Sequence, residues 1–231
     1  MKRNQHIADL GPLLAAQGIR HVIICPGSRN APLIQMFTGN PSFCCHSIVD
    51  ERSAAYLALG MARRLQKPVA VVTTSGTAVL NLAPAVAEAQ NQCIPVILFT
   101  ADRPRESIPQ FNNQIIDQKE PFLRNSRGFF QLPEETADPA GLEKMLGEVE
   151  SMIRRACTPP QGPVHFNVPL AEPLYEPLPA PFFSHFRSRG KDPFPDADQE
   201  SFGEKDQPSF GKIPGGGRIL VLAGMGPHGG E

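Results

Sequence analysis

SIVDERSAAYLALGMARR, residues 47–64, passes from an apolar strand end directly into a helix, and this junction decides the fold. Asp50 suits the N-cap position, because its carboxylate can accept hydrogen bonds from the first free backbone N–H groups of a helix. The small apolar side chains that follow give the helix a nearly continuous apolar surface, which predicts burial among other elements. Glu51 then lies in the first helical turn, at the carboxyl end of a strand.

Glu51 has two interpretations at this position. Ligands of open α/β sheets bind at the carboxyl ends of the strands, which makes Glu51 a candidate catalytic residue. A glutamate in the first turn also suits the helix dipole, an effect worth up to about 1 kcal/mol. The spacing alone favours the second interpretation, and only the rest of the chain changes the balance.

Short apolar runs alternate with helical patterns along the first 170 residues. Buried strands are expected at 21–25, 42–49, 69–73, 95–100 and 162–168. Helices are expected at 5–17, from about 31, from 51 to about 66, from 77 to about 90 and at 141–157. This alternation predicts an α/β fold with a doubly wound, mainly parallel sheet and helices on both faces. Residues 101–136 are polar and show no clear pattern.

The composition divides the chain into three parts. Residues 1–170 are expected to form the α/β domain, and 171–217, which are dense in Pro, Gly, Ser and charge, predict a linker. Residues 218–231 open with the strand-like RILVLA and predict the truncated start of a further domain. The G-x-G-x-x-G pattern at 224–229 is not followed by the helix and acidic residue that a dinucleotide site needs, which favours coincidence.

Charge and cysteine content exclude several classes of function. A net charge of −1 and a pI near 6.6 give no electrostatic basis for binding nucleic acid or an anionic membrane. The amino terminus lacks the apolar core of a signal peptide, and no apolar run is long enough to span a membrane. The five cysteines match no zinc or redox spacing, so we expect reduced thiols in a cytoplasmic protein and no metal site.

Polar groups follow four of the expected strands at the point where each strand ends. Each group has an ordinary alternative: a surface arginine, a helix cap, a first-turn glutamate or a solvated loop. Because the carboxyl ends of parallel strands meet at one edge of the sheet, we expect these residues to line a single crevice. The candidates are Ser28, Arg29, Glu51, Thr74, Ser75, Gly76, Thr77, Arg103, Asn113 and Gln114.

Five blocks resemble, in order and spacing, the N-terminal domain of thiamine diphosphate enzymes. They read CPGSRNAPL, VDERSAAYLALGMA, KPVAVVTTSGTAVLNLAPAVAEA, PVILFTADRPRE and VHFNVPLAEPLY. Within that superfamily the PGSR, TSGTA, ADRP and AEPLY segments are similar to the MenD family of menaquinone biosynthesis. The family reaction decarboxylates 2-oxoglutarate and adds the succinyl unit to isochorismate.

The resemblance implies a role for each candidate residue. In the superfamily, the glutamate that matches Glu51 hydrogen-bonds N1′ of the aminopyrimidine ring and activates the cofactor. Thr74, Ser75, Gly76 and Thr77 would border that ring. The isochorismate and succinyl side of the crevice would be formed by Ser28, Arg29, Arg103, Asn113 and Gln114.

The resemblance also implies partners that these 231 residues do not include. The family's cofactors are thiamine diphosphate and Mg²⁺ (or Mn²⁺), and both need a diphosphate-binding domain that this sequence lacks. We therefore expect a homo-oligomer, dimer or tetramer, for the full-length enzyme and no activity for the chain alone. Two alternatives stay open: another thiamine diphosphate enzyme, related to acetolactate synthase, and a non-catalytic dimerisation or binding module.

Overall fold

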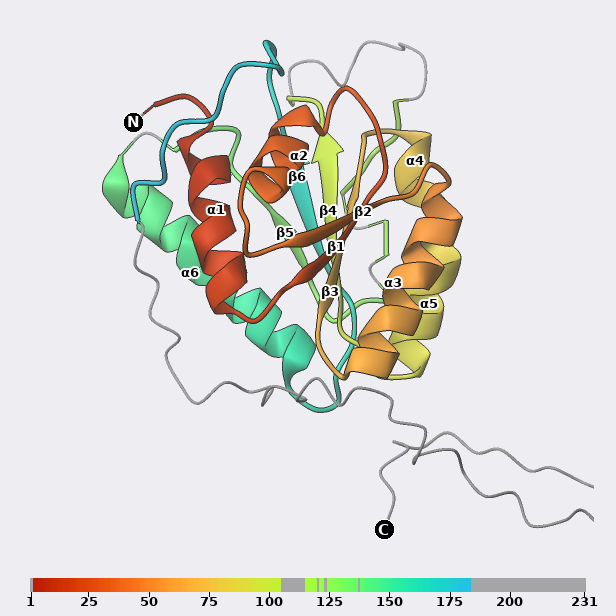
Figure 1. The fold of residues 1–231 in the computed structure, drawn as a ribbon. Helices are drawn as coiled ribbons and strands as arrows, with labels where there is room; N and C mark the ends of the chain where they lie inside the picture. The colour runs from red at the N-terminus through yellow and green to blue at the C-terminus, as the bar shows by residue number, and fades with distance from the viewer. Residues whose placement is uncertain (1, 105–114, 120, 123, 137, 184–231) are drawn as a thin grey trace, which may run out of the picture. The chain divides into compact units, whose positions relative to one another are not determined.

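The computed structural model of the chain contains a six-stranded sheet with helices on both faces (Figure 1). It describes residues 2–104, 115–119, 121–122, 124–136 and 138–183. The strands are β1 (His21–Ile24), β2 (Cys44–Ser47), β3 (Val69–Thr73), β4 (Val96–Asp102), β5 (Phe129–Gln131) and β6 (Val164–Pro169). All neighbouring strands are parallel, in the order β2-β1-β3-β4-β6-β5, which confirms the predicted fold class.

Two hydrophobic cores lie on the two faces of the sheet. One core contains buried side chains of α1 (Gln5–Ala16), α2 (Ala31–Thr38) and α6 (Pro139–Cys157). The other contains those of α3 (Glu51–Leu65), α4 (Thr77–Leu80) and α5 (Ala83–Asn91). Successive side chains of a strand point to opposite faces of the sheet, so Val22 and Ile24 belong to the first core and Ile23 to the second. Among the described residues, no helix is both long and apolar enough to cross a membrane.

The structure differs from the sequence prediction at two elements. The helix expected from 77 to about 90 is interrupted after Leu80, because Pro84 lacks the N–H that would bond the Leu80 carbonyl and its ring would clash there. The edge strand β5 was not predicted, since it has three residues, all only partly buried, inside a polar segment. The strand expected at 218–223 lies outside the described residues.

The junction before α3 forms as predicted, but the helix is buried on one face only. Asp50 caps α3, its Oδ1 accepting a hydrogen bond from the Ser53 backbone N–H at 2.7 Å. Small side chains such as Ala54 and Ala58 pack against the sheet. On the opposite face Tyr56 is 44 % exposed and Leu57 is 40 % exposed, so the expected all-round burial is wrong for the single chain.

Residues 171–183, the first part of the predicted linker, lie against α1. The carbonyl of Ala180 accepts a hydrogen bond from Gln5 Nε2, and the backbone N–H of Phe183 donates to Asp9 Oδ1. Leu174 is only 6 % exposed and belongs to the first core. Proline restricts the backbone to an extended form, and such a segment can pack against a domain as well as link two domains. The rest of the predicted linker lies outside the described residues. The chain divides into two units, 1–194 and 195–231, and every described residue belongs to the first.

If residues 171–183 stabilise the domain, replacing Leu174 by alanine will lower the free energy of unfolding by about 2 kcal/mol or more, because a buried leucine is lost. Tyr175→Ala is the matched control, since Tyr175 is 71 % exposed and its loss should cost no more than about 0.5 kcal/mol. Chemical denaturation of the two variants measures both values. Equal and small effects would show that this segment does not contribute to the folded domain.

Candidate functional site

The sheet order identifies the crevice where a ligand would bind. Strand β1 lies between β2 and β3, so the chain leaves β1 in one direction and returns on its other side. In open α/β sheets, ligands bind in the crevice beside such a switch point, at the carboxyl ends of the strands, which here are β1 and β3. There the loop after β1 touches the turn after β3, because a Cβ on Gly27 would lie 2.4 Å from the Cβ of Thr74. The structure thus brings together two of the predicted groups, Ser28–Arg29 and Thr74–Thr77.

Glu51 lies at the same edge, at the start of α3 and beside the end of β1. Its carboxylate is close enough to Cys25 to act on the thiol: burial, and then the charges of Glu51 and Asp50, raise the pKa of Cys25 to about 12. Cys25 is therefore a neutral thiol at physiological pH. The Glu51 side chain is partly exposed, and the described residues donate no hydrogen bond to its carboxylate.

The turn Thr74–Thr77 offers its side chains to a ligand more readily than its backbone at Gly76. Gly76 has φ 83°, a conformation that favours glycine, and its N–H donates to Gln118 Oε1 at 2.7 Å. That N–H is therefore not available to a ligand. Thr74 and Ser75 are partly exposed and Thr77 is exposed, so their hydroxyls are the groups that a ligand could reach.

Arg29 is bound to the segment that follows β6. Its Nη1 donates to the Leu170 carbonyl at 3.0 Å, and its Nη2 forms an ion pair with Glu172 Oε1 at 3.2 Å. The Arg29 side chain is 16 % exposed, whereas that of Glu172 is 73 % exposed. An exposed ion pair contributes little to stability, so a ligand carboxylate can replace Glu172 at low cost. Ser28 beside it is exposed.

Arg103 follows β4 and completes the row of predicted groups within the described residues. Its backbone N–H donates to Asp102 Oδ1 at 2.8 Å, and its side chain is partly exposed. Asn113 and Gln114 lie outside the described residues. The predicted groups that are described thus follow four adjacent strands, β2, β1, β3 and β4.

Sequence reasoning missed a buried polar network beside the crevice, centred on Asn167. Its Oδ1 accepts from Thr100 Oγ1 at 2.8 Å and from Gln118 Nε2 at 2.9 Å. Its Nδ2 donates to Asp102 Oδ2 at 2.6 Å and to Gln131 Oε1 at 2.9 Å. The amide of Asn167 is therefore fully satisfied. Polar residues inside the apolar strands PVILFTAD and VHFNV were the signal that could have indicated this network.

His165 adjoins this network as a neutral imidazole. Because the Thr100 hydroxyl donates to Asn167, it accepts from His165 Nε2–H, and the two atoms lie 2.7 Å apart. The ring contacts the rings of Phe122 and Phe129, and its buried Nδ1 has no partner in the described structure. Burial lowers the pKa of His165 to about 3. Burial also raises the pKa of Asp102, a change that the hydrogen bond from Asn167 opposes.

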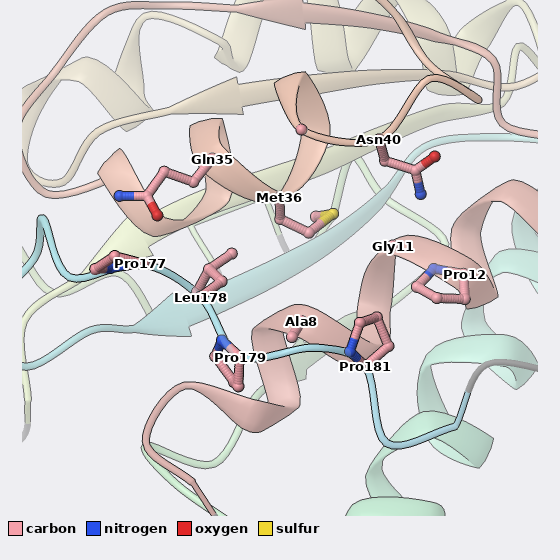
Figure 2. Close-up of a pocket in the computed structure, with 11 residues that line it drawn as sticks. Ala8, Gly11, Pro12, Gln35, Met36, Asn40, Pro177, Leu178, Pro179 and Pro181 are labelled. Carbon is pink, nitrogen blue, oxygen red and sulfur yellow. The ribbon is translucent and has the colours of Figure 1, made fainter.

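A separate pocket of about 320 Å³ lies between α1, α2 and the proline-rich residues 177–181 (Figure 2). Met36, Gln35 and Asn40 line it on the helix side, and Leu178 with three prolines lines it on the other. None of its lining residues is titratable, so the pocket offers no acid, base or nucleophile. The crevice remains the candidate site for chemistry.

Comparison with known proteins gives the class of this chain. Residues 4–121 match the family described as "Thiamine pyrophosphate enzyme, N-terminal TPP binding domain", thiamine pyrophosphate being the older name of thiamine diphosphate. The match covers β1 to β4 and therefore every candidate residue of the crevice, from Ser28 to Gln114. The chain belongs to this family.

Individual relatives show which members of this family the chain is similar to. The 2-succinyl-5-enolpyruvyl-6-hydroxy-3-cyclohexene-1-carboxylate synthase of Desulfotalea psychrophila is 48 % identical over 175 residues, 76 % of this chain and 33 % of that protein. The synthase of the same name from Flavobacterium psychrophilum is 47 % identical over 160 residues, 69 % of this chain and 28 % of that protein. The predicted similarity to the MenD family is confirmed. The chain spans about a third of the length of these curated relatives.

Changing Asn167 to aspartate will destabilise the domain strongly. The new carboxylate oxygen would face the oxygens of Asp102 and Gln131, so two hydrogen bonds would become repulsive contacts. We expect the free energy of unfolding at pH 7 to fall by about 3 kcal/mol or more. Asn125→Asp, at an exposed position, is the control and should stay near wild type. Similar denaturation curves for the two variants would contradict the importance of this network.

The buried histidine also predicts acid lability. The unfolded chain binds a proton at His165 below about pH 6.5, whereas the folded chain does so only near pH 3. The free energy of unfolding should therefore decrease as the pH falls through this window, by up to about 1.4 kcal/mol per pH unit for this group. Denaturation between pH 6 and 4 should show a smaller slope in His165→Gln than in wild type. An identical slope would mean that His165 is not neutral in the fold.

Proposed function

We propose that this chain forms the aminopyrimidine-binding half of the active site of a thiamine diphosphate-dependent carboligase. The complete enzyme would decarboxylate 2-oxoglutarate and add the succinyl unit to isochorismate, with Mg²⁺ (or Mn²⁺) at the diphosphate. The position of Glu51, at the switch point and without a hydrogen-bond partner among the described residues, is the observation that carries this proposal.

The crevice has the chemistry that an aminopyrimidine needs. A carboxylate can accept a hydrogen bond from a protonated ring nitrogen and so hold the proton there. The neighbouring thiol of Cys25 stays neutral, so it adds no second negative charge beside Glu51. The loop at Gly27 and the hydroxyls of Thr74 and Ser75 leave polar groups for the edge of the ring. No other acid or base is required of this part of the chain.

In the proposed reaction the cofactor, when bound, supplies the electron sink for decarboxylation and carbon–carbon bond formation. The chain's own residues would do the rest of the work on this side. Glu51 would hold the proton at N1′ of the pyrimidine. The Asn167 network would fix the turn at Gly76 through Gln118, and thereby the hydroxyls that border the ring.

The substrate side of the crevice would rely on cations. Arg29 would exchange its ion pair with Glu172 for a substrate carboxylate, which a guanidinium can bind with two parallel hydrogen bonds. Arg103 would bind a second anionic group, and Ser28, Asn113 and Gln114 would contact carboxylates and hydroxyls. Isochorismate carries both carboxylates and a hydroxyl, and 2-oxoglutarate carries two carboxylates.

We further propose that the complete enzyme is a homo-oligomer that covers the exposed face of α3. Four large apolar side chains on or near that face are uncovered in the single chain, at Val49, Tyr56, Leu57 and Leu80. A Cβ at Gly60 would meet nothing within 4 Å, so a neighbouring backbone could approach closely there. Five free thiols support the proposal that the enzyme works in the reducing cytoplasm.

The test uses a chimera in which this chain replaces the matching third of the Desulfotalea psychrophila synthase. Glu51→Gln should lower cofactor-dependent consumption of 2-oxoglutarate and isochorismate by about 10²-fold or more, because an amide cannot exchange the N1′ proton. Activity would be measured at saturating thiamine diphosphate and Mg²⁺.

Asp50→Asn is the matched control for this experiment. It removes a negative charge from the adjacent residue, and asparagine caps a helix as well as aspartate does. The control should retain activity near that of the unsubstituted chimera. Normal turnover by Glu51→Gln would instead leave Glu51 with no role beyond the helix dipole.

A further inference from the structure

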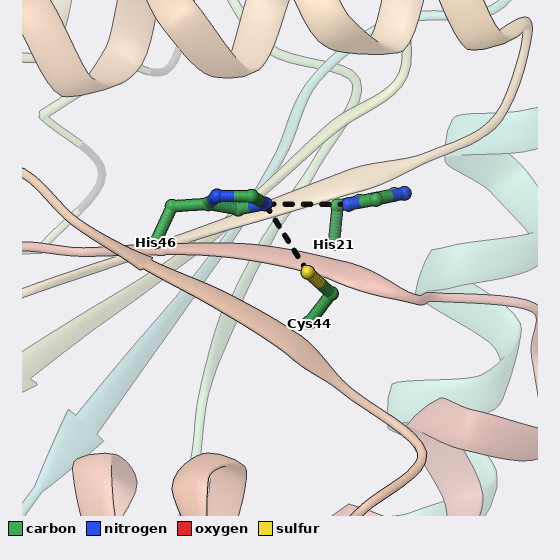
Figure 3. A group of neighbouring side chains, drawn as sticks. All are labelled: His21, Cys44 and His46. Atoms are coloured by element: carbon green, nitrogen blue, oxygen red, sulfur yellow. Dashed lines mark hydrogen bonds between the residues drawn. The ribbon is translucent and has the colours of Figure 1, made fainter.

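Three side chains of types that can bind a metal ion converge at the amino-terminal ends of β1 and β2 (Figure 3). His21 is the first residue of β1, and the strand register pairs it with Cys44, the first residue of β2. His46 lies two residues further along β2, so it points to the same face as Cys44. The spacing of Cys44 and His46 is the signal that could have indicated the group, but the register that adds His21 is not visible in the sequence.

The distances between the donor atoms suit one small cation. His21 Nδ1 lies 3.4 Å from His46 Nε2, Cys44 Sγ lies 3.6 Å from the same nitrogen, and all three ligand atoms lie within 4.8 Å of one another. In a tetrahedral zinc site, bonds of about 2.05 Å to nitrogen and about 2.3 Å to sulfur place two nitrogens about 3.3 Å apart and nitrogen and sulfur about 3.6 Å apart. Two of the three separations therefore match the edges of such a tetrahedron.

Hydrogen bonding alone does not account for this arrangement. His46 Nε2 is the shared atom of both contacts, and it carries either one N–H or one lone pair. A single N–H or lone pair can align well with only one of the two neighbours, so hydrogen bonding leaves the other contact weak. One cation placed among the three atoms would satisfy all of them at once.

We propose that His21, Cys44 and His46 bind a zinc ion, with water as the fourth ligand. Thiolate and imidazole are the donors that zinc prefers, and the partly exposed position of the group leaves room for water and for access of the ion. The site lies at the opposite end of the strands from Glu51, which follows the carboxyl end of β2. The inference is therefore independent of the function proposed for the crevice.

The ion would strengthen a weak part of the sheet. Strand β2 has four residues, forms the edge of the sheet and pairs with β1 alone. Zinc bound to one residue of β1 and two of β2 would join the two strands. Because the ligands are assembled only in the folded chain, binding would stabilise the fold by mass action.

Cobalt(II) titration of the metal-free 231-residue chain tests the site directly. We expect one ion per chain, with the intense visible bands of a tetrahedral ion and a thiolate-to-cobalt charge-transfer band that zinc abolishes. Cys44→Ser should remove the charge-transfer band. His21→Gln and His46→Gln should each weaken binding by more than the roughly 10- to 100-fold that even an outer-shell change costs.

Cys93→Ser is the matched control, because Cys93 is also an exposed free thiol but lies after α5. It should bind cobalt as the wild type does. A charge-transfer band that persists in Cys44→Ser, or that disappears in Cys93→Ser, would place the metal on another thiol and overturn the proposal. The absence of any tetrahedral cobalt spectrum in the wild type would overturn it as well.

Thermal unfolding provides a second readout that does not depend on spectroscopy. Zinc should raise the melting temperature of the wild type and of Cys93→Ser, and leave that of Cys44→Ser and His46→Gln unchanged. Melting of each metal-free variant shows whether it is folded before zinc is added. An equal rise in all four proteins would mean that zinc binds elsewhere.

Discussion

The buried amide of Asn167 is the contact on which the candidate site depends. A polar group in the interior costs free energy unless its hydrogen bonds are made, and the buried Asn167 on β6 makes all four of them. Its partners come from β4, from β5 and from the segment that contains Gln118. Hydrogen bonds depend on direction as well as on distance, so the network restricts the relative positions of these elements more tightly than apolar packing would.

One side chain connects the Asn167 network to the crevice. Gln118 donates to Asn167 and to the Ala101 carbonyl, and its oxygen accepts from the N–H of Gly76. Gly76 in turn sets the direction of the turn that touches Gly27 at the end of β1. A contact in the interior of the sheet thereby fixes the distance between the β3 turn and the loop beside Glu51, although neither of them touches Asn167.

The sequence was informative where structure depends on neighbours in the chain. Apolar runs located β1, β3, β4 and β6, and Asp50 located the start of α3, since strand burial and capping are local. The ion pair of Arg29 with Glu172 and the hydrogen bond from the Thr100 hydroxyl to Asn167 join residues far apart in the chain, at separations of 143 and 67 residues. Such partners depend on the strand order and register, which hydrophobic patterns do not specify. The same limit concealed the approach of His21 to Cys44.

The exposed face of α3 and the exposure of Glu51 can be explained together. Water competes for the hydrogen bonds of a partly exposed carboxylate, so Glu51 would hold a ring proton most effectively when its surroundings are dry. The neighbouring apolar side chains of Val49 and Leu57 are exposed to water, and burying them would be favourable. In the proposed oligomer, a second subunit packed on this surface would bury the apolar side chains and exclude water from the carboxylate. One contact would therefore stabilise the assembly and complete the site, which ties the proposed activity to oligomerisation.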